Sequence, residues 1–434
     1  MRSVQDQLSL VAASVVAPRP VQMAISEAQG LLCAEEVVTT DPLPGFDQVA
    51  VDGYAVRAVD VAFAGSPAPA ELADLDTGGL DVARVDGSDE LVVSLPVVGE
   101  VSPGSRTPIR LQPGQAVRVQ TGAPMPTLAD AVVPLRWTDG GDNRVMIGHA
   151  VATGEYVRRT GDDVQPGDVA VSEGAVIGPA QVGLLAAVGR SRVLVHPRPR
   201  VAVISIGDEL VDIDRDPGPG QVYDVNSYAL AAAARDAGAD VHRVGVAVRD
   251  HERLRETVEA QLIRSEIVVL CGSVGGEASR EVAEVLADLG DLEIERIAMH
   301  PGSVQGFGRL GRDEIPTFWL PANPVSALVT FEVMVRPLIR IALGKRQPMR
   351  RTVRARTIGP IASVIGRTGY LRGQLMRDER SDDYLVQVIG ESPTGTSHLL
   401  AELAEANCLI VVDEDTEELD TGDWVEVMFL AQRG

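Results

Sequence analysis

Acidic residues and glycines follow three apolar runs in the middle of the chain. Asp208 and Glu209 come after VAVIS, and Asp250 comes after VGVAV. A third run, IVVLC, leads into GSVGGEASREV, whose glycines and first acid are Gly272, Gly275, Gly276 and Glu277. Backbone N–H groups of such a loop can bind an anion, and carboxylates suit Mg²⁺ bound together with substrate phosphates. The pattern predicts an anion site with Asp208, Glu209 and Asp250 as candidate Mg²⁺ ligands.

Helix capping is the alternative role for some of these polar residues. Asp208 could cap the next helix, and Asp250 stands directly before HERLRETVEAQ, which has helical character. In LPANPVSALVTF, Asn323 or Ser326 could cap a helix that begins near Pro324, or could present its N–H groups to an anion. Capping and ligand binding are compatible roles.

Parallel strands would bring these loops to one edge of a sheet. Between residues 198 and 345, apolar runs alternate with helical segments such as NSYALAAAARDAGA and DHERLRETVEAQLIRS. This alternation predicts a doubly wound, mostly parallel α/β sheet, in which ligands bind outside the carboxyl ends of the strands.

The remaining segments predict strands, with helices only near the N-terminus. Residues 3–16 have helical spacing, and residues 22–38 predict a second helix that leads into a strand. Short Val-rich runs from 44 to 150 predict an all-β module, and alternating strands from 347 to 434 predict a small β-barrel or sandwich.

The fold class predicted from these patterns is multi-domain α/β plus β. The expected parts are a discontinuous N-terminal helical and linker part (1–45 and 146–178), a β-rich insertion (46–145), the α/β domain (179–345) and a C-terminal β-barrel-like domain (346–434).

Two polar loops lie in the Val-rich module. Asp52 and Gly53 form a dipeptide typical of a hairpin turn, between apolar runs in FDQVAVDGYAV. The segment TGAPMP, which begins at Thr121, could be only a rigid loop.

Composition excludes several classes of function. The 434 residues carry 39 Lys and Arg against 62 Asp and Glu, a net charge of -23, which argues against a nucleic-acid-binding surface. Cys33, Cys271 and Cys408 form no CxxC pair, so neither a zinc site nor a disulfide framework is expected. No apolar run is long enough to cross a membrane, and no signal-peptide pattern opens the chain. We expect a cytoplasmic protein without direct membrane insertion.

The chain resembles the molybdopterin molybdotransferases, MoeA in bacteria and the E domain of gephyrin in animals, over essentially its whole length. The matching stretches, in order, are PLPGFDQVAVDGYAVRA, VQTGAPMPTLADAVV, RRTGDDVQPGD, RPRVAVISIGDELVD, QVYDVNSYAL, AMHPGSVQGFG and LPANPVSALVTFEVMVRP. The resemblance implies an elongated homodimer of four subdomains. It also implies Mg²⁺-dependent hydrolysis of adenylylated molybdopterin and insertion of molybdate into its dithiolene.

The resemblance also implies roles for individual residues. By motif position, Asp52, Glu209 and Asp250 are the acids expected to act in catalysis, with Glu277 as a further candidate. The residues expected to contact molybdopterin are Thr121, Gly272, Gly275, Gly276, Ser303, Asn323 and Ser326.

Several positions depart from the family pattern. The family has two aspartates in the loop after its glycines, where this chain has Ala278 and Arg280. The family's PGKP is here PGSV, so Ser303 replaces a lysine that would bind an anion. LPGNP becomes LPANP at Ala322, and TGDEL becomes IGDEL at Ile206. Glu277 or Glu281 could substitute for the lost aspartates.

These losses favour a second function, a dimeric scaffold similar to gephyrin and to bacterial gephyrin-like proteins, over the molybdotransferase, which is the alternative. By resemblance, Leu8, Tyr370 and Asp413 would line a groove for a peptide tail of a cytoskeletal or membrane protein. The resemblance to bacterial gephyrin-like proteins implies the C-terminal tail of FtsZ as that peptide, which would recruit the protein to the division site. A scaffold would need neither Mg²⁺ nor molybdopterin.

Overall fold

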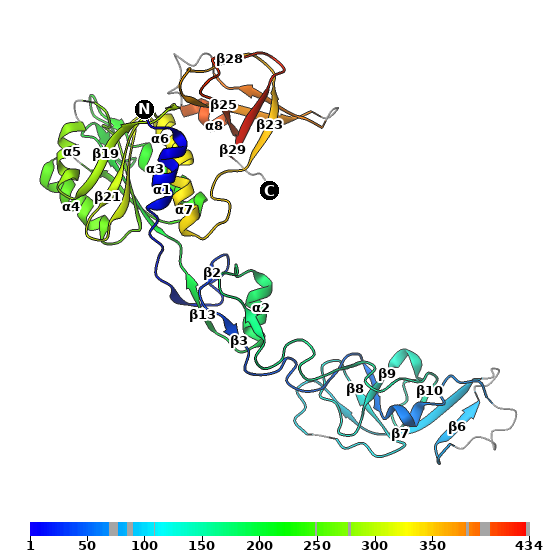
Figure 1. Cartoon of the computed structure of the whole chain (residues 1–434). Coiled ribbons are helices and arrows are strands. Elements are labelled where there is room, and N and C mark those ends of the chain that lie inside the picture. The colour runs from blue at the N-terminus through cyan, green and yellow to red at the C-terminus, as the bar shows by residue number, and fades with distance from the viewer. Residues whose placement is uncertain are drawn as a thin grey trace. The chain divides into compact units, whose positions relative to one another are not determined.

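The computed structural model describes residues 1–68, 77–84, 90–107, 109–247, 250–276, 279–378, 382–390 and 400–430. Its chain divides into two compact units (Figure 1). Unit 1 comprises Met1–Gln22, Gly30–Ala34 and Leu194–Gly434, and unit 2 comprises Met23–Gln29 and Glu35–Val193.

Unit 2 is mostly β-structure, as the Val-rich texture predicts. Its main sheet has the order β10-β7-β8-β5-β9, with β6 paired to β7. These strands are β5 (Gly53–Val56), β6 (Asp81–Arg84), β7 (Leu91–Val101), β8 (Ala116–Val119), β9 (Ala131–Pro134) and β10 (Arg144–Ile147). Smaller elements are β3 (Val37–Val38), β4 (Gln48–Val49), β11 (Val157–Arg158), β12 (Val169–Val171), α2 (Pro179–Ala187) and the 3₁₀ turns η1 (Ala58–Val61) and η3 (Leu135–Trp137).

Unit 1 contains the predicted α/β domain. Its six-stranded sheet has the order β17-β14-β18-β22-β21-β19, and the first four strands are parallel. The strands are β14 (Arg200–Ile206), β17 (Asp240–Ala247), β18 (Ile267–Cys271), β19 (Gly290–Arg296), β21 (Val304–Leu310) and β22 (Ile315–Leu320). Two parallel two-residue strands, β15 (Leu210–Val211) and β16 (Val222–Tyr223), follow β14.

Helices cover both faces of this sheet (Figure 1). Alternate residues of each strand point to opposite faces, so Val201 and Val203 pack in one hydrophobic core while Ala202 and Ile204 pack in the other. The first core is covered by α1 (Val4–Ala13), α3 (Asn226–Ala237), α6 (Pro324–Thr330), the π-helical turn η4 (Phe331–Val335) and α7 (Arg336–Ala342). The second is covered by α4 (His251–Leu262) and α5 (Ser279–Ala287). The doubly wound prediction is confirmed.

The C-terminal part is a closed five-stranded β-barrel. Its strands pair in the order β25-β26-β23-β29-β27, and an additional β25–β27 pairing closes the ring. The elements are β23 (Thr352–Thr357), β25 (Thr368–Arg377), β26 (Tyr384–Val388), α8 (Leu400–Glu405), β27 (Cys408–Val412) and β29 (Trp424–Phe429), with the small pair β24 (Ile361–Ala362) and β28 (Glu418–Leu419). Strand β20 (Met299–His300) of the α/β domain pairs with β25, so the segment before PGSV lies beside the barrel.

Two local predictions are wrong. Residues 22–38 form no helix but contain the short strands β1 (Val21–Ala24), β2 (Leu32–Cys33) and β3. Distant strands determine this outcome, because β2 pairs with β13 (Arg192–His196) and β3 pairs with β12. Asp52 and Gly53 form no hairpin, because β5 pairs with β8 and β9. A Cβ at Gly53 would lie 2.0 Å from the Val133 carbonyl oxygen, so close strand approach explains this glycine.

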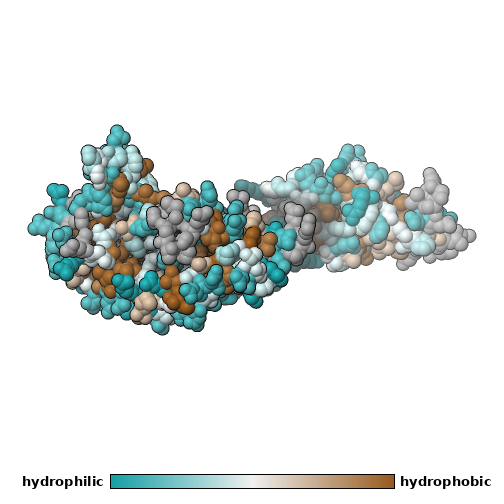
Figure 2. Space-filling view, turned by 90° about the horizontal axis from the view of Figure 1, so that it is seen from above, coloured by the Kyte–Doolittle hydropathy of each residue, from teal (hydrophilic) through white to brown (hydrophobic). Residues whose placement is uncertain are grey.

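Two further properties concern the membrane and the cysteines. No helix among the described residues is long and apolar enough to cross a membrane. The three cysteines are free and buried. Hydrophobic residues that remain exposed form separate brown patches among hydrophilic ones on the face in Figure 2.

Candidate functional site

The carboxyl end of β14 presents the first predicted acids. Asp208 and Glu209 are both exposed, and they begin the turn that leads into β15. A Cβ at Gly207 would lie 2.8 Å from both carboxylate oxygens of Glu209, so the glycine leaves the space that this carboxylate occupies. The Glu209 backbone is also restrained, because its carbonyl oxygen accepts a hydrogen bond from Val222 N at 2.9 Å.

The glycine loop after β18 packs tightly against its neighbours. Gly272 has φ +122°, and a Cβ there would meet the Ile206 carbonyl oxygen at 2.2 Å. The indole Nε1 of Trp319 donates to the Gly272 carbonyl. A Cβ at Gly275 would meet the Val304 side chain at 2.6 Å, so this loop contacts the PGSV segment. Gly276 lies in the open, while Glu277 and Ala278 lie outside the described residues.

The predicted capping roles are present at two other loops. The Asp250 side chain accepts a bond from Arg253 N at 3.1 Å and caps α4. Asn323 accepts from Ser326 N at 3.0 Å and caps α6. No three Asp, Glu, His or Cys side chains among the described residues cluster closely enough to hold a metal ion. The residues that the structure describes therefore form no preformed Mg²⁺ cage.

Polar groups of the PGSV loop and of the loop between β22 and α6 already have hydrogen-bond partners within the protein. The Ser303 hydroxyl donates to the Ile297 carbonyl at 2.9 Å. The side-chain amide of Asn226 donates to the Ala322 carbonyl at 2.8 Å, while its Oδ1 is buried and has no hydrogen-bond partner. Asn226 therefore contacts the loop between β22 and α6 through its NH₂ group, and sequence reasoning missed this residue.

A cavity of about 340 Å³ lies between the α/β domain and the barrel within unit 1. His300, Pro301 and Val325 line its α/β side, and Tyr370 and Arg372 line its barrel side. Arg372 is 9% exposed and pairs with Glu402 at 2.9 Å. Burial raises the pKa of the Tyr370 phenol to about 12. The cavity therefore combines an apolar wall with one buried cation.

Asp52 and Thr121 form a separate site in unit 2. Thr121 donates to Asp52 Oδ1 through its backbone N at 2.7 Å and its hydroxyl at 2.9 Å. The backbone bond is the main reason that the pKa of Asp52 lies below its usual range. The structure thus brings together two residues that the sequence analysis assigned to separate loops.

The predicted peptide-binding residues have unequal environments. Leu8 packs against the hydrophobic core cluster that includes Tyr370. Tyr370 is 7% exposed and pairs with Val411 of β27. Asp413 follows that strand and is exposed. Tyr370 therefore belongs to a hydrophobic core against which Leu8 packs, whereas Asp413 is a surface residue outside that core.

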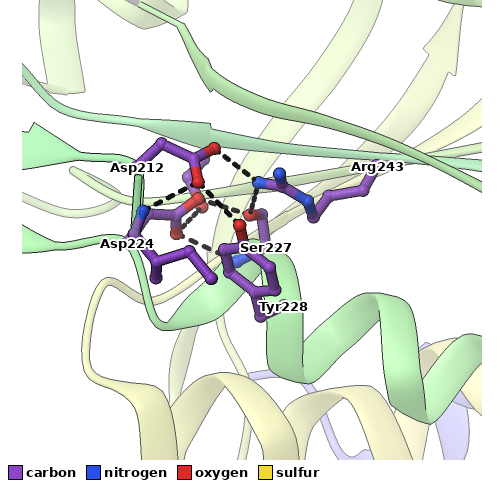
Figure 3. Close-up of polar contacts among 7 residues, drawn as sticks. Asp212, Asp224, Ser227, Tyr228 and Arg243 are labelled. Atoms are coloured by element: carbon purple, nitrogen blue, oxygen red, sulfur yellow. Dashed lines mark hydrogen bonds and ion pairs between the residues drawn. The ribbon is translucent and has the colours of Figure 1, made fainter. Parts of the chain in front are cut away.

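A second polar cluster, also missed from the sequence, includes Asp212 and Asp224 of the segment that follows Glu209 in the chain (Figure 3). Asp212 accepts from the Tyr228 hydroxyl at 2.6 Å and from Arg243 at 3.0 Å. Asp224 accepts from the Ser205 hydroxyl at 2.7 Å and from both the backbone and the hydroxyl of Ser227. The bond from Tyr228, ahead of that from Arg243, holds the pKa of Asp212 below its usual range.

Three regions of the chain match known protein regions. Residues 2–189 match the MoeA N-terminal region (domain I and II), residues 202–341 a probable molybdopterin binding domain, and residues 354–430 the MoeA C-terminal region (domain IV).

Known relatives match along nearly the full length. The chain is 64% identical to molybdopterin molybdenumtransferase 1 of Mycobacterium tuberculosis, with 100% of both chains covered. It is 37% identical to molybdopterin molybdenumtransferase 2 of the same species, over 98% of this chain and 99% of that one. The solved structure of a molybdopterin biosynthesis MoeA protein from Pyrococcus horikoshii superposes with a TM-score of 0.76 at 29% identity, covering 99% of each chain. The chain therefore belongs to the MoeA family of molybdopterin molybdenumtransferases.

Proposed function

We propose that the protein transfers molybdenum from molybdate to molybdopterin. The observation that carries this proposal is the cavity with Arg372 in its wall, next to the loops of the molybdopterin-binding domain. A guanidinium is a strong ligand for oxyanions. The names of the relatives at 64% and 37% identity support the transferase over the scaffold that the sequence departures favoured.

The proposed chemistry has two balanced steps. Water attacks the phosphoanhydride of adenylylated molybdopterin, one P–O bond forms as another breaks, and AMP leaves. Two Mo–S bonds then form to the dithiol as one Mo–O bond breaks, and the two thiol protons leave with that oxide as water. Arg372 would hold the oxyanion, and Glu209 would orient the attacking water from the sheet edge.

An insertion assay tests this proposal. Purified protein would receive adenylylated molybdopterin, molybdate and Mg²⁺, with AMP release and activation of a molybdenum-dependent apoenzyme as readouts. We expect turnover in the wild type, a loss of at least tenfold in Arg372→Gln, and wild-type rates in Arg356→Gln, an exposed arginine of β23. Absence of turnover by the wild type would refute the transferase.

A peptide-binding scaffold is the second candidate, favoured by the shared core of Leu8 and Tyr370. The proposed ligand is the FtsZ tail, and recruitment from the cytoplasm to the division site belongs to this proposal. Because Tyr370 is only 7% exposed, a peptide must bind at its edge or uncover it. Titration of labelled peptide should give saturable binding that Tyr370→Ala abolishes and Tyr384→Ala preserves. The homodimer is likewise a proposal, which sedimentation analysis tests.

A further inference from the structure

The segment 207–224 carries Glu209 but has little packing of its own. It leaves the end of β14, and its strands β15 and β16 contain two residues each. Residues 213–217 and 219–223 are exposed. Short strands with so few buried contacts do not hold a fixed position by themselves. Side-chain contacts must therefore supply most of the restraint on this segment.

Side chains of the α/β domain hold both ends of the segment, and one arginine connects the two sets of contacts (Figure 3). Asp212, just after β15, and Asp224, just after β16, are the two anchors. Nη1 of Arg243 donates to Asp212 at 3.0 Å and to the Ser227 hydroxyl at 3.1 Å, and Ser227 is itself bonded to Asp224. Arg243 thus joins the two anchors.

The geometry uses properties that only arginine has. The Arg243 guanidinium carbon lies 3.9 Å from the ring centre of Tyr228, and the hydroxyl of the same tyrosine donates to Asp212. A planar cation can stack on a ring while its edge donates to a carboxylate, whereas an ammonium group is a point charge without that fork. Arg243, Tyr228 and Asp212 therefore form a closed triangle of mutual contacts.

We propose that Arg243, acting through Asp212 and Tyr228, is a positioning residue that fixes the Glu209 carboxylate at the sheet edge. Asp212 is three residues from Glu209 in the chain, so release of this anchor frees the turn that carries the carboxylate. A misplacement of about 1 Å in a catalytic group can reduce the rate about a hundredfold. This inference rests on the proposed molybdenum transfer.

Three variants and one control test the role. Arg243→Gln removes the charge and the stack, Arg243→Lys restores the charge alone, and Tyr228→Phe removes one hydroxyl. Arg253→Gln, an exposed arginine of α4 outside the triangle, is the matched control. We expect kcat for AMP release to fall about 10- to 100-fold in Arg243→Gln with KM unchanged, partial recovery in Arg243→Lys, and wild-type values in the control. Amide hydrogen exchange should rise in residues 207–224 and stay unchanged in α4.

The outcomes separate this inference from the function beneath it. An active wild type whose Arg243→Gln variant keeps kcat within about twofold, despite faster exchange in 207–224, would overturn the positioning role alone. A raised KM with unchanged kcat would also overturn it, because the arginine would then act on binding. An inactive wild type would refute the transfer reaction and the positioning role with it.

Discussion

Replacement of Tyr370 by Phe should change how the stability of the protein depends on pH. The phenol is buried in the cavity wall, and its pKa is raised from the ordinary 10.0 to about 12, chiefly by burial and secondly by the charge of Glu426. The folded state therefore keeps this proton at a pH where the unfolded chain has released it. Phe has no proton to release in either state.

The sign and size of the effect follow from this difference. The stabilisation is fully present below the unfolded pKa, and it is lost as the pH rises from about 10 to about 12. A separation of about two pH units corresponds to about 2.7 kcal/mol of unfolding free energy. Relative to Tyr370→Phe, the wild type should lose about 1.4 kcal/mol per pH unit within this window.

Urea unfolding of both proteins between about pH 9 and about pH 11.5 measures this difference directly. Other tyrosines and basic groups titrate in both proteins, so their effects cancel in the comparison. The difference in absorbance at the tyrosinate band would locate the Tyr370 titration independently. A stability difference that stays constant across this range, or a tyrosinate signal that appears at the ordinary value, would refute the buried-phenol argument.

Substitutions at Gly272, Asp250 and Glu332, the first two with a matched control, probe the packing of the α/β domain. In a urea titration, Gly272→Ala should lower the unfolding free energy by about 2 kcal/mol or more. The new Cβ would lie 2.2 Å from the Ile206 carbonyl oxygen, and the backbone there has a φ of +122°. Gly276→Ala is the control and should be nearly neutral, because no atom lies within 4 Å of its Cβ position. Asp250→Ala should cost about 1 kcal/mol by removing the cap of α4, and Asp250→Asn should retain most of it in thermal unfolding. Glu332→Gln should cost about 3 kcal/mol in chemical denaturation, because the buried carboxylate pairs with two arginines that would lose it.

Local signals explain which parts of the fold the sequence predicts. Helix α4 begins directly after its cap Asp250 because the cap and the apolar spacing lie within one segment, and α3 ends before its cap Gly238, whose φ of +106° suits glycine. The helix prediction for residues 22–38 is wrong because these residues form strands by pairing with residues far along the chain, such as Val195 opposite Cys33. No periodicity within 22–38 encodes that partner.

The candidate site is likewise predicted where local patterns define it and missed where it depends on contacts between distant residues. The sequence predicts the glycine loop and the acids at strand ends, because a parallel sheet gathers them at one edge. It does not predict that Thr121 bonds Asp52, since 69 residues separate them. Arg372 was missed because alternation along β25 predicts a strand without indicating what faces it.

The two candidate functions make different demands on one wall of the cavity. Tyr370 and Arg372 are two residues apart on β25, so their side chains share a face. A peptide would use the apolar part, whereas an oxyanion depends on the guanidinium. Ser303 supplies no cation, and its hydroxyl is bonded to Ile297, so attraction for an anion in this cavity depends chiefly on Arg372, set against its partner Glu402 and against Glu418 in the lining. Oxyanion affinity is therefore the property on which the transferase and the scaffold differ most sharply, and the balance between this arginine and the neighbouring carboxylates sets it.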